Sequence, residues 1–347
     1  MIIYIILTLI SFFGTLYVLP HSIKKLRMNN YLAKDMYKID KPFIPTNCGI
    51  ILVFTSFLAI SLVPFISRSV NFFYEVPIEN SNLYDVHFAF LLVVSVYALY
   101  GLVDDLVDIG RVLKLILPIA FSFPLVSVIS ISTFWIPYYG VFNLESIIIS
   151  EVSYSDIFRL IIIPIYVMVV ANLVNMHSGY NGLQSGLSII LILSICFKAY
   201  EDNSLANIFP VFGILGAMMA FLIFNKYPSR AFEGNIGSLF FGSTIGVLIV
   251  IQKYWWFGVF ILLPHTLNFL LWILWLILMK RRPEEYVGSD GKHRKFGVVR
   301  EDGTIEVPNR LTLKWIPNYY FKFTEQQSTF SMYIITIFFC MTGLLLF

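Results

Sequence analysis

Two adjacent aspartates, Asp104 and Asp105, directly follow an apolar run long enough to cross a lipid bilayer, residues 86–103. Neighbouring carboxylates repel each other, so they persist at a membrane boundary where water, a cation or a function holds them. A single aspartate there would be read as a polar end to the helix. Because Asp108 and Lys114 follow closely, the pattern also fits a metal and phosphate site at the membrane face.

Three further polar segments have the residue types that such a site needs. Carboxylate and amide oxygens suit Mg²⁺, Lys and Arg bind phosphate oxygens, and glycines let the backbone approach a ligand closely. An aromatic side chain beside them can stack on a nucleobase. Phosphoryl transfer uses this combination of a divalent ion, a cationic clamp and a positioned nucleophile. The segments are residues 172–182, 227–235 and 292–295.

Each of these segments also has a purely structural interpretation. Asn172 and Asn175 could bridge helices, residues 227–230 could form a turn, and residues 292–295 could face lipid headgroups. For the last two segments taken alone, the structural interpretation is the simpler one. A common site is favoured only if all the segments meet at one face of the membrane.

The composition predicts a polytopic membrane protein rather than a soluble domain. Of the 347 residues, 58% are hydrophobic and 13% are charged, and the mean hydropathy is +0.79. The 3 cysteines fall in separate apolar runs, which excludes a disulfide framework and a thiolate metal site. Apolar runs of about 20 residues predict transmembrane helices. Ten such runs lie near residues 1–20, 47–66, 86–103, 115–133, 157–174, 183–200, 206–225, 236–252, 256–279 and 328–347.

Lysine and arginine sort into alternate connections of this bundle. Most of the 24 lie in residues 21–46, 104–114, 226–235 and 280–327. The positive-inside rule places these connections in the cytoplasm and both termini outside, so all the polar segments share the cytoplasmic face. The chain is therefore predicted to be one all-α transmembrane bundle over residues 1–347, with a cytoplasmic substrate-binding excursion at residues 280–327. Two β-prone runs around Asp302-Gly303 predict a small β-hairpin in the excursion.

The chain resembles the polyprenyl-phosphate N-acetylhexosamine-1-phosphate transferases. It is most similar to their eukaryotic and archaeal branch, the UDP-GlcNAc–dolichyl-phosphate GlcNAc-1-phosphotransferases, which begin N-glycan assembly and are blocked by tunicamycin. The resemblance covers about residues 31–310 and rests on motifs in family order and spacing. These motifs are KDMYKIDKPFIPTNCGI, GLVDDLVDIGRVLKLILP, NLVNMHSGYNGLQSG, NKYPSRAFEGN and GKHRK. Ten helices with outer termini is also the family architecture.

The resemblance implies a Mg²⁺-dependent phosphoglycosyltransferase, with Mn²⁺ as a substitute metal. It would transfer N-acetylhexosamine-1-phosphate, foremost GlcNAc-1-phosphate, from the UDP-sugar to a polyprenyl or dolichyl phosphate and release UMP. Direct attack by the lipid phosphate is expected, with a covalent aspartyl-phosphate route as an alternative. The protein is expected in the cell membrane or endoplasmic reticulum membrane, with its site facing the cytoplasm. No nucleic acid partner is expected, and a homodimer is compatible with the sequence.

The resemblance also implies roles for single residues. Asp104 and Asp105 would organise Mg²⁺ and the lipid phosphate, and Lys114 would contact phosphate. Asn175 would ligate Mg²⁺. Asn235 would be a second ligand, but the family has an aspartate there, so weaker Mg²⁺ binding is expected unless another carboxylate compensates. A catalytically damaged relative is the alternative outcome.

The resemblance places a further group of residues around the UDP-sugar. The uracil would be read by Asn181 and the backbone near Gly179, and Phe232 would stack on it. The pyrophosphate and the sugar would be held by a basic pair in the excursion. The full expected substrate-binding set is Met36, Lys38, Gly179, Asn181, Phe232, His293 and Arg294.

Two other functions stay open. A transporter for nucleotide sugars or other small molecules would also be polytopic, but its ionisable and helix-breaking residues belong near mid-span. Here the span middles are apolar and the polar groups lie at one set of helix ends, which favours the enzyme. The second alternative is a family member with a different sugar or lipid, such as the bacterial phospho-MurNAc-pentapeptide translocase. The YPSRAFEGN and KHRK stretches favour the GlcNAc branch.

Overall fold

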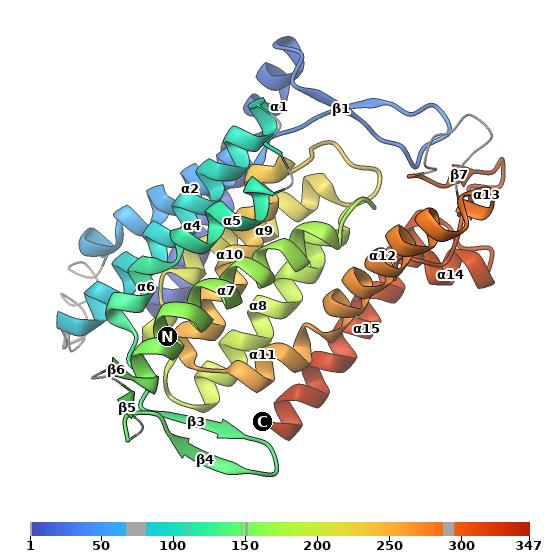
Figure 1. The fold of residues 1–347 in the computed structure, drawn as a ribbon. Coiled ribbons are helices and arrows are strands. Elements are labelled where there is room, and N and C mark those ends of the chain that lie inside the picture. Colours follow the sequence, from blue (N-terminus) through green and yellow to red (C-terminus); the bar gives the residue numbers. More distant parts are fainter. Residues whose placement is uncertain are drawn as a thin grey trace.

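The structure is a computed structural model that describes residues 2–66, 81–107, 109–110, 112–146, 148–149, 152–286 and 295–347. Within these residues, 8 helices are long and apolar enough to cross a membrane, and two shorter apolar helices accompany them. The predicted all-α polytopic architecture is confirmed (Figure 1). These helices are α1 (Ile2–Met28), α2 (Gly49–Ser61), α4 (Ser81–Val107), α7 (Tyr154–Met176), α8 (Leu183–Glu201), α10 (Gly234–Gln252), α12 (Leu263–Arg281) and α15 (Glu325–Leu346). The candidate span that contains α2 runs on to Ile66.

The predicted spans at 115–133 and 256–279 are each divided into two α-helices. The expected helix at 115–133 is divided into α5 (Leu113–Phe121) and α6 (Phe123–Val128), and Pro124 lies in the first turn of α6. The expected helix at 256–279 is divided into α11 (Trp255–Ile261) and α12, with Pro264 in the first turn of α12. Proline lacks a backbone N–H and is tolerated at the start of a helix, so both prolines mark a new helix start. The remaining helices are η1 (Leu205–Ile208), α9 (Val211–Asn225), α13 (Pro283–Tyr286) and α14 (Trp315–Tyr320).

Helix α10 forms the centre of the bundle and packs against α2, α4, α7 and α8. In its most apolar window 89% of the residues are buried, against 22% in α1 and in α12, whose outer faces are therefore available to lipid. Small residues let the backbones approach, as in other membrane bundles. A Cβ atom added at Gly242 would lie 2.7 Å from the Cα atom of Ala171 on α7.

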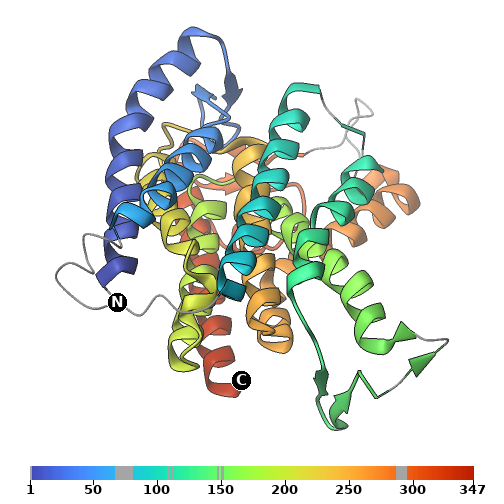
Figure 2. The ribbon, with the colours of Figure 1, turned by 90° about the vertical axis from the view of Figure 1, so that its left-hand side faces the viewer.

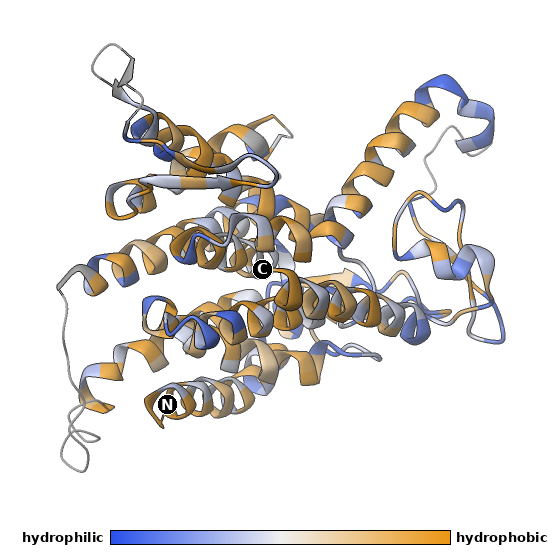
Figure 3. Ribbon diagram, turned by 90° about the horizontal axis from the view of Figure 1, so that it is seen from below, coloured by the Kyte–Doolittle hydropathy of each residue, from blue (hydrophilic) through white to orange (hydrophobic). Residues whose placement is uncertain are grey.

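The two ends of the bundle carry different short strands. One end carries the antiparallel pair β1 (Leu32–Lys34) and β2 (Phe43–Pro45). The opposite end carries both termini together with the β3–β4 and β5–β6 pairs (Figures 1 and 2). Hydrophobic residues cover the helices, whereas hydrophilic residues gather at helix ends and after α12 (Figure 3). These strands are β3 (Thr133–Ile136), β4 (Gly140–Asn143), β5 (Ile148–Ile149) and β6 (Val152–Ser153).

The segment between α12 and α15 contains the predicted hairpin, in which β7 (Val298–Val299) pairs antiparallel with β8 (Ile305–Glu306). The Asp302 carboxylate accepts hydrogen bonds from the backbone N–H and hydroxyl of Thr304, which closes the turn. The part of this segment after β8 packs onto the start of α8 and the loop after β1. Together they form a small core that contains Tyr37, Tyr180, Leu183, Trp275, Ile305 and Trp315.

Candidate active site

A cavity of about 350 Å³ lies where the loop after β1, the end of α4, the α7–α8 turn and the segment before α10 meet. The structure thus brings together groups that are far apart in the sequence, as the proposal of a common site requires. Residues singled out from the sequence make up much of the lining. They are Met36, Asp105, Asn175, Gly179, Asn181, Phe232 and Asn235.

Asp105 binds the first turn of the central helix. Its two carboxylate oxygens accept hydrogen bonds from the backbone N–H groups of Asn235 at 3.1 Å and Ile236 at 3.2 Å. These are unpaired donors at the positive end of α10, where an anion is stabilised. Gly234 leaves room for this contact, because its φ is +70° and an added Cβ would lie 2.8 Å from Asp105 Oδ2. The α10 N-terminus and the end of α4 are therefore one structural unit.

Asp104 connects Lys114, which was expected at the phosphate, with Asn235, which was expected at the metal. Its Oδ1 accepts from Lys114 Nζ at 2.8 Å and from the backbone N–H of Ile109 at 2.9 Å. Its Oδ2 accepts from the Asn235 amide nitrogen at 2.9 Å. The Lys114 side chain keeps 35% of its surface exposed, whereas the Asp104 side chain keeps 6%. The buried carboxylate therefore orients an ammonium group that stays accessible to a ligand.

The donor set of the cavity fits a hard divalent cation. Asp105, Asn175, Glu233 and Asn235 all line it and carry oxygen donors of the type that Mg²⁺ prefers. Among the residues that the structure describes, no three acidic, histidine or cysteine groups converge in a metal-binding arrangement. A metal held here would therefore depend on amide oxygens and on the phosphates of a substrate as well as on carboxylates.

Glu233 is the extra carboxylate of the cavity, and it follows Phe232 directly. It lines the cavity and accepts a hydrogen bond from the Asn225 amide nitrogen at 3.1 Å. Burial raises the pKa of Glu233 to about 7, and the Asn225 hydrogen bond opposes this rise. Near neutral pH the Glu233 carboxyl is therefore only partly ionised, and a cation beside it would favour its charged form. With a cation bound, Glu233 is the candidate to replace the negative charge that Asn235 lacks.

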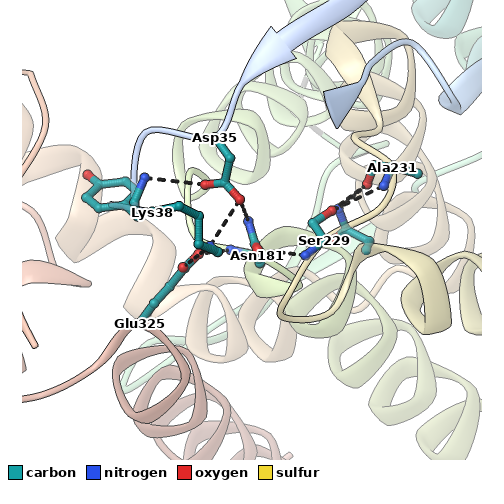
Figure 4. A network of polar contacts seen from close by, with 8 residues as sticks. Asp35, Lys38, Asn181, Ser229, Ala231 and Glu325 are labelled. Atoms are coloured by element: carbon teal, nitrogen blue, oxygen red, sulfur yellow. Dashed lines mark hydrogen bonds and ion pairs between the residues drawn. The ribbon is translucent and has the colours of Figure 1, made fainter. Parts of the chain in front are cut away.

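A buried polar network holds the opposite wall of the cavity (Figure 4). The Asn181 side chain donates to Asp35 at 3.1 Å and accepts from the backbone N–H of Ser229 at 2.9 Å. The Asn181 backbone N–H donates to Glu325 at 2.6 Å. Both polar ends of this amide are engaged within the protein, so the network fixes its orientation. Its expected contact with uracil stays a prediction.

Lys38, expected to bind substrate, lies in the same network rather than in the cavity lining. Its ammonium is 2.5 Å from Glu325 and 3.0 Å from Asp35, and it lies over the Tyr227 ring at 4.4 Å. The ion pair between Lys38 and Glu325 joins the loop after β1 to the first residue of α15. The contacts therefore indicate a structural role for Lys38, and substrate binding by it stays a prediction.

The expected pyrophosphate clamp, His293 and Arg294, lies outside the described residues. Two residues that were not predicted for the site, Glu325 and Lys314, both contact the cavity wall. The Lys314 Nζ donates to the backbone carbonyl of Ser178 at 2.5 Å. A signal for Glu325 was present, since it is the acidic residue at the start of the last apolar run. Nothing local indicated its partners.

Comparisons with known proteins agree with this geometry. The sequence profile of glycosyl transferase family 4 matches residues 87–253. A protein of Sulfolobus acidocaldarius, provisionally named UDP-N-acetylglucosamine–dolichyl-phosphate N-acetylglucosaminephosphotransferase, is 30% identical over 249 residues, which cover 71% of this chain and 70% of the relative. A provisionally named glycosyltransferase of Methanocaldococcus jannaschii is 26% identical over 98% of this chain and 95% of its own length.

A more distant relative comes from bacteria. The phospho-N-acetylmuramoyl-pentapeptide-transferase of Streptococcus mutans is 24% identical over 258 residues, 73% of each chain. The matched regions span the end of α4, the α7–α8 turn and the start of α10, where the cavity lies. The chain belongs to the polyprenyl-phosphate N-acetylhexosamine-1-phosphate transferases of glycosyl transferase family 4, a family of membrane-bound phosphoglycosyltransferases.

Proposed function

We propose that the protein transfers GlcNAc-1-phosphate from UDP-GlcNAc to dolichyl phosphate or a related polyprenyl phosphate and releases UMP. The observation that carries this proposal is a second, apolar hollow of about 530 Å³ beside the polar cavity. Asn175 lines both, and Lys114 lines the apolar one. The other walls come from α7 and α12 and include Met168, Val169, Phe269 and Trp272. A soluble nucleotide sugar suits the polar cavity, and a polyprenyl chain suits the apolar hollow.

In this proposal the lipid phosphate reaches Lys114 from the apolar hollow. The Lys114 ammonium, oriented by Asp104 at 2.8 Å, binds the phosphate and reduces its charge. A phosphate oxygen of the lipid attacks the sugar-side phosphorus of UDP-GlcNAc, a new P–O bond forms, and the bond to UMP breaks. No general base is required, because the acceptor phosphate is ionised near neutral pH. The hydrogen bonds to the α10 N-terminus hold Asp105 beside the reacting groups.

We propose Mg²⁺ as the metal, held by Asp105, Asn175, Glu233 and Asn235, with Mn²⁺ as a substitute. When bound, the ion supplies positive charge that stabilises the pyrophosphate and the leaving UMP. We also propose that the cavity faces the cytoplasm and that both termini lie outside. Most of the basic residues lie in the connections at the cavity end, which supports this orientation. A homodimer, with which the sequence is compatible, is a further proposal, and the mass of the purified protein in detergent tests it.

The direct test is release of UMP from UDP-GlcNAc by the purified protein, with and without dolichyl phosphate and Mg²⁺. UMP formation that depends on both additions supports the proposal. A transporter would release no UMP under any of these conditions, and that result would remove the enzyme proposal. Replacing the donor by UDP-MurNAc-pentapeptide tests the activity printed in the name of the bacterial relative.

Asn235→Asp is expected to strengthen Mg²⁺ binding and to weaken the metal-free fold. The new carboxylate would replace an amide that donates to Asp104 at 2.9 Å, so two like charges would meet until a cation separates them. The unfolding midpoint is expected to fall without Mg²⁺ and to rise more steeply with added Mg²⁺ than in the wild type. Half-saturation of UMP release should move to lower Mg²⁺. Equal Mg²⁺ dependence of both proteins would contradict the assignment of Asn235.

Val169→Trp is expected to raise the KM for the lipid phosphate by roughly tenfold while leaving the KM for UDP-GlcNAc unchanged. Val169 lines the apolar hollow and is 41% exposed, so the larger ring fills space that the lipid would use. Ile165→Trp is the matched control, since Ile165 is a similarly exposed residue of α7, 40% exposed, and is not among the residues that line the hollow. Equal effects of both variants on the lipid KM would reject the hollow as the lipid site.

A further inference from the structure

Lys314 makes an interaction that the proposed mechanism does not use. It follows the β7–β8 hairpin in the chain, and its side chain ends against the turn between α7 and α8. Its Nζ donates to the Ser178 carbonyl at 2.5 Å. It also lies 5.0 Å from the centre of the Tyr180 ring and 5.6 Å from the centre of the Tyr37 ring. The ammonium is thus enclosed by a carbonyl oxygen and two aromatic rings.

The turn that Lys314 contacts is a wall of the polar cavity. Ser178, Gly179, Tyr180 and Asn181 all line the cavity, whereas Lys314 is not among its lining residues. Gly179 has a φ of +104°, and a Cβ atom added there would collide with Lys314 Nζ. The ammonium is therefore packed directly against the backbone of the turn. A residue with a side chain at position 179 would both strain the backbone and displace the lysine.

The two ends of this turn are fixed by different parts of the chain. Lys314 holds the Ser178 carbonyl, whereas Glu325 accepts from the backbone N–H of Asn181 at 2.6 Å. The residues between these anchors line the cavity, so the conformation of the turn helps to shape it. A loss of either anchor would leave the turn free to rotate its peptide groups, since a buried carbonyl must find another donor.

We propose that Lys314 is a positioning residue for the nucleotide: it fixes the Ser178–Asn181 turn so that its backbone groups are oriented toward the base of a uridine nucleotide. This inference rests on the proposed function, which places the UDP moiety in the polar cavity. It assigns no bond-making step to Lys314. The lysine acts on nucleotide affinity through the turn, and the lipid phosphate and the reacting phosphorus are bound elsewhere.

The test compares wild type with Lys314→Met, which keeps the length of the side chain but removes the donor. The KM for UDP-GlcNAc is expected to rise by roughly tenfold, and the Kd for UDP, measured by calorimetry, by a similar factor. The KM for dolichyl phosphate and the value of kcat are expected to stay unchanged. Lys322→Met is the matched control, because Lys322 is an exposed lysine of the same excursion. An unchanged KM and Kd for the nucleotide in Lys314→Met would overturn the proposal.

A pH series separates positioning from general loss of structure. Burial lowers the pKa of Lys314 to about 8, and the Glu325 charge opposes this shift. The other titratable groups facing it are Tyr37, Tyr180 and His177. A neutral amine binds the carbonyl and the rings less strongly than an ammonium group. The KM for UDP-GlcNAc of Lys314→Met, divided by that of the wild type, should therefore fall toward 1 between about pH 7 and about pH 9. A constant ratio, or a rise of both substrate KM values with a lower unfolding midpoint, would overturn the proposal.

The same measurements distinguish a failure of the proposed function from a failure of the inference about Lys314. If wild type neither releases UMP nor binds UDP, the nucleotide site itself is absent, and Lys314 has no ligand to position. If wild type is active and Lys314→Met behaves like Lys322→Met, the function stands and the inference about Lys314 falls.

Discussion

Asp105→Asn is expected to lower kcat for UMP release by roughly 10²–10³-fold, or to below detection. The substitution removes the negative charge that the proposed metal and phosphate site needs. It keeps a side-chain oxygen that can accept from the N–H of Asn235 or Ile236, so the α4–α10 contact is largely preserved. The measurement is UMP release at saturating Mg²⁺ and both substrates, beside the unfolding midpoint in detergent.

The matched control for this variant is Asp40→Asn. Asp40 is an exposed aspartate of the loop after β1, so it loses the same charge on the cavity side of the protein without touching the α10 N-terminus. Wild-type turnover is expected for it. Turnover close to wild type in Asp105→Asn would remove Asp105 from the catalytic machinery. Loss of turnover together with loss of folding would assign Asp105 to the structural contact alone.

Lys38→Met is expected to destabilise the protein by about 3–5 kcal/mol, because it removes one partner of a buried ion pair. The side chains of Lys38 and Glu325 are 11% and 3% exposed. Without the ammonium, the carboxylates of Asp35 and Glu325 are left together in a buried site. The measurement is denaturant or thermal unfolding in detergent, followed by tryptophan fluorescence.

The double variant Lys38→Met/Glu325→Gln, compared with the two single variants, measures the interaction between Lys38 and Glu325. In the wild type the backbone N–H of Asn181 donates to Glu325 at 2.6 Å, and glutamine keeps an oxygen for this hydrogen bond. Glutamine also removes the Glu325 charge, which the loss of the Lys38 ammonium would leave uncompensated. The double variant is therefore expected to lose less stability than the sum of the two single variants. Additive losses would show that Lys38 and Glu325 act independently and would reject the ion pair as the element that holds α15 to the loop after β1.

The sequence predicts most of the helices because a bilayer imposes a minimum apolar length. It does not predict where α5 ends and α6 begins, or where α11 ends and α12 begins. Both regions read as unbroken apolar runs, and prolines such as Pro124 and Pro264 are tolerated within transmembrane helices as well as at their starts. The sequence also does not predict the short strand pairs between residues 133 and 153, whose strands are 4 residues long or shorter.

The candidate site was predictable where residues lie in local motifs at helix ends. Asp105, Asn175 and Asn235 end or begin helices on one side of the bundle, so the topology alone brings them together. Lys38 and Glu325 are 287 positions apart, and no local pattern encodes their pairing. The contact between Lys314 and Ser178 joins residues 136 positions apart, and no local pattern encodes it either. Of the aromatic residues that follow Lys314, Trp315 packs into the small core, whereas Tyr319 and Tyr320 stay exposed.

The sharing of Asn175 between a polar cavity and an apolar hollow has a kinetic consequence. Under the proposed function, the concentration of UDP-GlcNAc is an amount per volume of water, whereas that of dolichyl phosphate is an amount per area of bilayer. Diluting the membrane with inert lipid at constant total dolichyl phosphate should therefore slow the reaction, whereas diluting the whole suspension at saturating nucleotide should leave the rate per enzyme unchanged. The rate would thus depend on the surface density of dolichyl phosphate in the leaflet and not on its concentration in the whole suspension.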